Sequence, residues 1–163
     1  MTVDELGEYG MERMDDHQIA QFLSIQSIGV LGLSTREEPY LLPMSFGFDG
    51  ESRLYFVFVV GSASRKAALA SRAETASFLV YSAETAFHWR SVLVSGPLRE
   101  LSEDERAELS ETETPAWRPE LFETVSEVEE TRLFELRIEE WTGIGHDIRP
   151  PAYYQRSSAD RSE

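Results

Sequence analysis

A succession of short strand patterns, separated by turn residues, constrains the fold of this chain more than any other feature. Between residues 28 and 60 three apolar runs follow one another, and Asp49-Gly50 is typical of a tight hairpin between the last two. Further strand patterns lie at 76–81, 87–95 and 131–138. Closing such strands into a barrel removes their exposed edges. The sequence therefore predicts a mainly β fold, a six-stranded antiparallel barrel with peripheral helices.

Helical patterns are few and short, and the chain length of 163 residues fits one domain with a substantial core. We expect this domain to span residues 15–149, after a loosely ordered lead-in over 1–14 and before an extended or disordered tail over 150–163. Helices are predicted over about 15–27, 67–73, 102–110 and 120–127, the first capped by Asp15 or Asp16 and the third opened by the capping box Ser102–Glu105.

The charge is strongly and diffusely acidic, with 30 acidic and 15 basic residues and a formal net charge of −15. Such a surface repels nucleic acids and anionic membranes, so neither is expected as a partner. Near-absence of lysine together with diffuse acidity favours a halophilic protein, although an acidic mesophilic protein is the alternative. The N-terminus lacks an apolar signal segment, and no run approaches a membrane span, so a cytoplasmic location is expected.

Redox and metal chemistry are constrained by which residues the chain contains. Cysteine is absent, which excludes disulfides, thiolate ligands and a cysteine nucleophile. The three histidines, His17, His88 and His146, are scattered without acidic neighbours at metal spacing, so no metal site is expected. Any redox chemistry must therefore come from a bound cofactor.

The passage from the strand pattern 54–60 into the Ala-rich segment is the best candidate binding site. It reads Gly61-Ser62-Ala63-Ser64-Arg65-Lys66 and contains the one lysine of the chain. Small residues followed by two cations at a helix start can bring backbone N–H groups and fixed charge onto a phosphate. The alternative is a solvated helix start with a serine cap, because short motifs match often by chance.

Two pieces of sequence together resemble the FMN-binding split barrels of the pyridoxamine 5′-phosphate oxidase-like superfamily. One is the strand-to-helix passage from Leu54 to Ala67, and the other is Trp89 to Gly96, a strand ending in glycine. The resemblance covers roughly residues 15–145 and implies a split barrel that binds FMN at a homodimer interface. It implies that Arg65 and Lys66, with Ser64 beside them, hold the FMN phosphate.

The resemblance also implies which other residues contact the cofactor. Pro43, Met44 and Ser45 on the second strand and Phe56, Val57 and Phe58 on the third would line the flavin ring, while Trp89, Arg90 and Ser91 would come from the partner subunit. Alternation of faces allows about half of the strand residues to touch the ring. Tyr55, Phe56 and Phe58 have the alternative role of filling the barrel core, since aromatic residues favour strands.

The sequence leaves three alternatives for the function of the protein. The C-terminal segment His146–Arg149 lacks the basic arrangement with which the true oxidase holds its substrate's phosphate, so pyridoxamine phosphate oxidation is not expected. The leading hypothesis is an FMN-dependent oxidoreductase acting on a small molecule, with no catalytic residue identified and Arg90 as a group that steadies negative charge. The alternatives are an F420-dependent reductase of the same fold and a non-catalytic flavin-binding or interaction module.

Overall fold

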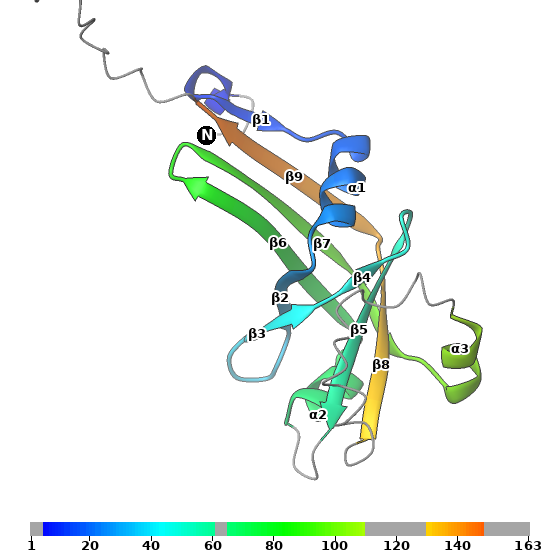
Figure 1. Ribbon diagram of the computed structural model, residues 1–163. Helices are drawn as coiled ribbons and strands as arrows, with labels where there is room; N and C mark the ends of the chain where they lie inside the picture. The colour runs from blue at the N-terminus through cyan, green and yellow to red at the C-terminus, as the bar shows by residue number, and fades with distance from the viewer. Residues whose placement is uncertain (1–4, 61–64, 110–129, 149–163) are drawn as a thin grey trace, which may run out of the picture.

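The computed structural model describes residues 5–60, 65–109 and 130–148, which form mainly antiparallel β-structure with a few short helices. The order of elements is η1 (Glu5–Tyr9), β1 (Met11–Arg13), α1 (Asp16–Ile25), β2 (Ile28–Leu33), β3 (Tyr40–Ser45), β4 (Gly47–Phe48), β5 (Arg53–Val60), α2 (Arg65–Arg72), β6 (Thr75–Thr85), β7 (His88–Glu100), α3 (Glu103–Glu108), β8 (Glu130–Arg137) and β9 (Glu140–Asp147) (Figure 1).

The strands form a closed path, which confirms the predicted antiparallel barrel. Their order is β3-β2-β6-β7-β8-β5-β4, and all of these neighbours pair antiparallel. Only Phe46 separates β3 from β4, so the path returns to where it began. If β3 and β4 are counted as one strand and β8 and β9 as another, β2 to β9 make up the six strands that the sequence predicts. β1 is an additional strand.

β7 is the strand that both halves of the barrel share. Its first part, His88 to Ser95, pairs with β9, and its last residues, Leu98 to Glu100, pair with β8. Gly96 lies at the change of partner, where a Cβ atom would stand 1.8 Å from the carbonyl oxygen of Arg137. The backbones therefore approach so closely that glycine is required at this point.

The core is built from the inward faces of the strands and is closed at one end by α1. Phe78 stands at its centre and makes edge-to-face contacts with Phe46 and Phe56, at centroid distances of 5.1 and 4.9 Å. α1 begins at a capping box in which Asp15 accepts from the Gln18 backbone N–H at 2.8 Å. The predicted amphipathic helix is therefore present, and it buries Ile19, Phe22 and Leu23.

Some sequence expectations are corrected and some lie outside the described residues. Residues 5–13, expected in a loosely ordered lead-in, form η1 and β1, and β1 pairs with β9. β9, which runs from Glu140 to Asp147, continues the β-structure beyond the last strand pattern named above. The helix predicted over 120–127 and the tail over 150–163 lie outside the described residues. Within the described part of the chain, no helix combines the length and the apolar run that a membrane crossing needs.

Candidate functional site

β3 and part of β5, which precede and follow β4 in the chain, each have a backbone edge without a further strand partner among the described residues. β3 pairs with β2 alone, and β4 reaches β5 only through Tyr55 and Leu54. Along Phe56–Val60, β8 is therefore the one strand partner of β5 within the described residues. Backbone N–H and C=O groups at such edges can bind a ligand or another chain.

Pro43 lies on β3, whose one strand partner among the described residues is β2. It lies opposite Val30, and its side chain is exposed on the outer face of the sheet. Proline lacks an N–H donor, so it is tolerated where no further strand pairs. Met44 points the other way and packs against the core, while Ser45 ends the strand half-buried. Pro43 and Ser45 thus share the outer face, and their contact with a cofactor stays a prediction.

The aromatic residues of β5 fill the core, which corrects their placement around a flavin ring. Phe56 is 0% exposed and Phe58 3% exposed. Phe58 meets Phe134 edge-to-face at 5.0 Å, as Phe56 meets Phe78. Their side chains are occupied by core packing, so only their backbone groups remain for a ligand. Val57 lies on the opposite face, half-buried, and its role stays a prediction.

The predicted phosphate site coincides with the beginning of α2. This helix begins at Arg65, five positions after the end of β5 at Val60, and includes Lys66 in its first turn. The first N–H groups of a helix have no partner within it, and the helix dipole favours an anion there. Ser64 lies outside the described residues, as do the side chains of Arg65 and Lys66.

Trp89, Arg90 and Ser91 lie on β7, near the tip of the hairpin with β6. Trp89 pairs with Ala83 across β6 and stacks on the ring of His146 at 5.8 Å, while Arg90 is exposed. Arg90 also borders a hollow of about 440 Å³ between α1, β1 and the β7–β9 pair. The sequence did not reveal this hollow, because its walls come from distant segments.

Within one chain these residues do not meet the α2 terminus. α2 leads into the start of β6 at Thr75, and Trp89 lies opposite Ala83, roughly 26 Å further along that strand at about 3.3 Å per residue. Figure 1 shows α2 at one end of the molecule and the β6–β7 tip at the other. The two predicted groups can therefore form one site only if the second comes from another subunit.

His146, one of the three histidines considered above, is a buried polar residue of β9. It is 8% exposed, and its Nε2 donates to the Tyr9 carbonyl oxygen at 2.9 Å, so it ties β9 to η1. Its Nδ1 has no hydrogen-bond partner in the described part of the chain. Among the residues that the structure describes, no group of three or more His, Asp or Glu side chains is placed to hold a metal ion.

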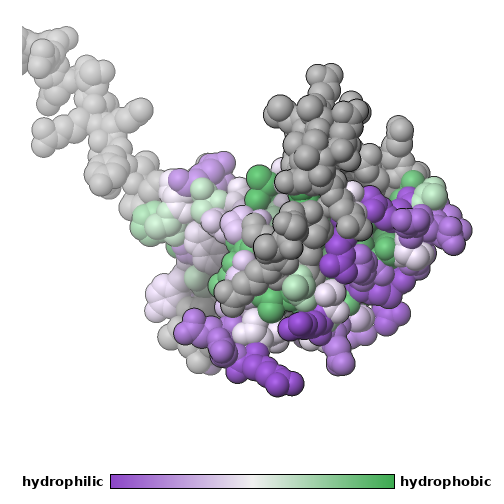
Figure 2. Space-filling model, turned by 90° about the horizontal axis from the view of Figure 1, so that it is seen from below, coloured by the Kyte–Doolittle hydropathy of each residue, from purple (hydrophilic) through white to green (hydrophobic). Residues whose placement is uncertain are grey.

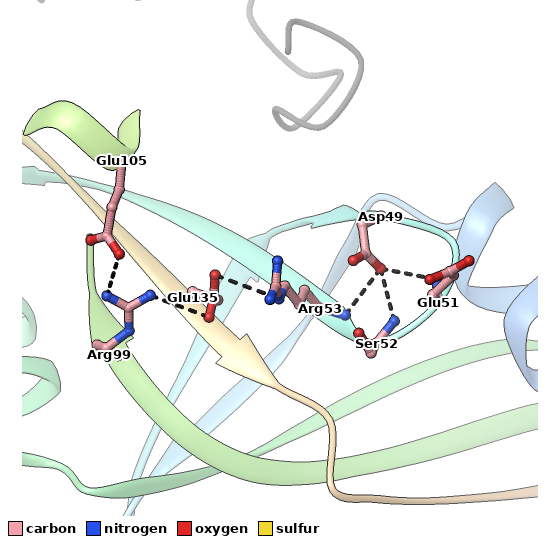
Figure 3. Close-up of polar contacts among 7 residues, drawn as sticks. All are labelled: Asp49, Glu51, Ser52, Arg53, Arg99, Glu105 and Glu135. Carbon is pink, nitrogen blue, oxygen red and sulfur yellow. Dashed lines mark hydrogen bonds and ion pairs between the residues drawn. The ribbon is translucent and has the colours of Figure 1, made fainter. Parts of the chain in front are cut away.

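A network of charges covers the outer face of β5, β8 and β7 (Figure 3). Glu135 lies between Arg53 and Arg99, at 3.9 and 3.6 Å, and Arg99 reaches Glu105 of α3 at 2.7 Å. Beside it, burial raises the pKa of Tyr55, against an opposing hydrogen bond from Arg53. Tyr55 therefore stays protonated at neutral pH and is not a general base.

Comparison with known proteins identifies the family. The family model described as pyridoxamine 5′-phosphate oxidase matches residues 15–144, which is most of the chain. The chain belongs to this family. The match covers the barrel from the cap of α1 to β9, and so it includes β3, β5, the start of α2 and the β7 segment with Trp89. No curated protein matches the sequence.

Solved structures share the fold of this family member at low sequence identity. An FAD-binding protein from Mesorhizobium loti is 18% identical, with a TM-score of 0.67 over 85% of this chain and 98% of that one. The FAD-binding protein from Mycobacterium smegmatis is 14% identical, with a TM-score of 0.63 over 85% and 100%. An FAD and heme binding protein from Mycobacterium smegmatis is 15% identical, with a TM-score of 0.63 over 86% and 75%.

Proposed function

We propose that this chain binds a flavin at a homodimer interface and acts as an oxidoreductase on a small molecule. The observation that carries the proposal is the start of α2 at Arg65, beside the free edge of β5, within a chain of the pyridoxamine 5′-phosphate oxidase family. Structural neighbours named as FAD-binding proteins support a flavin as the cofactor.

The donor groups of this region suit the phosphate end of a flavin. Unpaired N–H groups at a helix start, one arginine and one lysine match a phosphate near −2 charge, since arginine binds two oxygens and lysine acts as a point charge. The exposed backbone along β3 and β5 offers the donors and acceptors that the edge of a flavin ring needs. Pro43 and Ser45 on the outer face of β3 would lie against the ring.

The bound flavin supplies hydride chemistry, and the protein supplies binding and electrostatics. Phe56 and Phe58 keep β5 rigid from the core side, so its outer edge holds a fixed geometry. Tyr55 is buried and protonated, which leaves no proton-accepting role for it. Arg90, exposed and supplied by the second subunit, steadies negative charge on the ring or on the substrate.

The outer face of the sheet gives independent support for the homodimer. Leu79 and Leu93 are opposite one another on β6 and β7, and they are 37% and 47% exposed. Tyr81 and, on β2 and β3, Ile28 and Leu41 share this face and are still more exposed. A contiguous apolar patch of this kind marks an interface, and in a homodimer the same patch faces itself.

An absorbance spectrum of the purified protein in molar salt, with mass identification of any released chromophore, tests the proposal. We expect a flavin spectrum in the wild type and its loss in Arg65→Ala/Lys66→Ala, with an unchanged dimer. The matched control Arg99→Ala/Arg137→Ala removes two cations elsewhere and should keep the flavin. A colourless protein that also fails to bind added flavin would refute the proposal.

The same experiment separates the alternatives. Release of a deazaflavin would make the chain an F420-dependent reductase. Retained flavin without turnover by NAD(P)H and a panel of electron acceptors would make it a non-catalytic flavin-binding module. Retention of flavin by the Arg65→Ala/Lys66→Ala variant would remove α2 from the site.

A further inference from the structure

The hollow of about 440 Å³ between α1, β1 and the β7–β9 pair has a glycine at its floor. Gly145 of β9 lies opposite Glu12 of β1 on one side and opposite Arg90 of β7 on the other, and all three line the hollow. Residues that lie opposite one another in a sheet point to the same face. The two charged side chains therefore flank the place where Gly145 has no side chain, with their Cα atoms about 10 Å apart, two strand spacings.

The charges of Glu12 and Arg90 are not used within the described part of the chain. Neither side chain has a hydrogen-bond or ion-pair partner there. A Cβ atom on Gly145 would lie 3.8 Å from Cγ of Arg90, so the arginine side chain leans over the glycine. The other ionisable side chains of the lining each have a contact of their own, namely His88, Asp147, His146 and Arg13. One free cation and one free anion thus border the same space.

α1 adds an apolar wall and an amide to this space. Positions 18, 21, 22 and 25 lie on one face of the helix and line the hollow. Phe22 is buried, whereas Ile25 is 71% exposed beside the two free charges. Gln21 is exposed and can donate or accept a hydrogen bond. The volume lies within the range of small-molecule sites, about 300 to 1,000 Å³. The lining therefore suits a small ligand with both charged and apolar parts.

The charge of the whole chain selects against a ligand with net negative charge. It is −15, and Figure 2 shows that hydrophilic side chains surround a smaller hydrophobic area also at the end of the molecule with α2, away from this hollow. Such a field repels anions. A simple cation would meet the unneutralised guanidinium of Arg90. A zwitterion has no net charge to be repelled, and its two ends match the two free side chains.

We propose that this hollow binds a small zwitterion with an apolar side chain, of the α-amino-acid type. Arg90 binds the carboxylate, because a guanidinium holds two carboxylate oxygens at once, and Glu12 accepts hydrogen bonds from the ammonium group. The apolar side chain packs against Phe22 and Ile25. The inference goes beyond the proposed function, because this binding requires no flavin and shares only Arg90 with the proposed flavin site.

Isothermal titration calorimetry of the full chain with leucine and two analogues, at about pH 7 and one fixed salt concentration, tests this inference. Leucine carries both charges at this pH, whereas leucinamide lacks the carboxylate and 4-methylpentanoate lacks the ammonium group. Charged hydrogen bonds at both ends predict that leucine binds at least about tenfold more tightly than either analogue.

Three variants assign the binding to named residues. Arg90→Gln should remove the preference for leucine over leucinamide, and Glu12→Gln should remove its preference over 4-methylpentanoate. Gly145→Val fills the floor and should abolish the binding of all three ligands. It should not lower the midpoint of thermal unfolding, since Gly145 lies in a strand without positive φ and a Cβ atom there meets only ordinary contacts. The control Arg137→Gln/Glu139→Gln removes one cation and one anion from an exposed ion pair and should keep the affinity for leucine.

The outcomes separate this inference from the proposed function. Absence of leucine binding, or equal affinity for leucine and both analogues, would refute the zwitterion site. Tight leucine binding by Gly145→Val, or unchanged preferences in Arg90→Gln and Glu12→Gln, would place leucine elsewhere on the chain. The flavin absorbance of the same samples judges the proposed function independently, because neither leucine nor its analogues absorb there.

Discussion

The outer surface of the barrel differs between its two halves. Over β5, β8 and the end of β7, the chain covers its own sheet, since Arg53, Glu135 and Arg99 form a charge network and α3 packs beside it (Figure 3). Over β2, β6 and the start of β7, leucines and a tyrosine stay exposed, and no described helix covers them. The first half is covered by side chains and a helix of its own chain, whereas the second half is the face that the proposed homodimer would cover.

Side-chain truncation should lower the free energy of unfolding much more on the inner face of β6 than on its outer face. Phe78→Ala should lower the free energy of unfolding by about 3–5 kcal/mol, because Phe78 is fully buried between Phe46 and Phe56. Its neighbour Leu79→Ala should change the free energy of monomer unfolding by less than about 1 kcal/mol. Urea unfolding at low protein concentration measures both, and equal losses would contradict the assignment of faces.

A charge placed on the exposed apolar half should break the dimer. Leu93→Glu puts a carboxylate at the centre of the patch, opposite Leu79, and we expect the dimer dissociation constant to rise at least about 100-fold. Flavin retention should fall with it, because the proposed site takes Arg90 from the second subunit. Sedimentation analysis measures the association.

The control for this variant is Ile25→Glu, which changes an equally apolar residue that is 71% exposed at the end of α1. It should leave the dimer intact. Dimers that persist in Leu93→Glu would place the interface elsewhere.

The ion pairs of the charged half should contribute less to the free energy of unfolding than the core does, and their contribution should depend on pH. Two hydrogen bonds from the Arg132 guanidinium, of which the one from Nε is 2.6 Å long, lower the pKa of Glu100 from its usual 4.5. A lowered folded-state pKa stabilises the protein above the unfolded pKa, and this contribution is lost as the pH falls through the folded pKa. Glu100→Gln should therefore cost less than about 1 kcal/mol near pH 7, and nothing well below pH 4.5.

Unfolding measured at both pH values checks this prediction, with Glu51→Gln as a control in an exposed turn. A difference between wild type and Glu100→Gln that persists unchanged in acid would assign the effect to packing and not to the charge.

Local features of the fold were predictable from the sequence because their partners are close in the chain. Asp49 accepts from the backbone N–H groups of Glu51, Ser52 and Arg53, which fixes the predicted hairpin. The caps at Asp15 and Ser102 likewise bind residues three positions later. Such signals depend on a few neighbouring residues and need no knowledge of the tertiary structure.

Features that depend on distant partners were not predictable. Alternation along β5 separates Phe56 and Phe58 from Tyr55 and Val57, but only the pairing with β8 shows which set faces the core. β1 and β9 are too poor in aliphatic residues for a strong strand pattern, and they are strands because they pair with one another. A second hollow, between the β2–β3 loop and α2, likewise has a lining from segments that are far apart in the sequence, 34–37 and 69–72.

The pairing of β5 with β8 has a consequence for synthesis of the chain. β5 ends at residue 60, and its partner β8 begins only at residue 130. During synthesis on the ribosome, the aromatic and β-branched residues of β5 therefore remain without their main partner strand while β6, β7 and α3 are made. Unpaired apolar strands of this kind drive aggregation of nascent chains. Every C-terminal truncation before residue 130 leaves the barrel open along this strand.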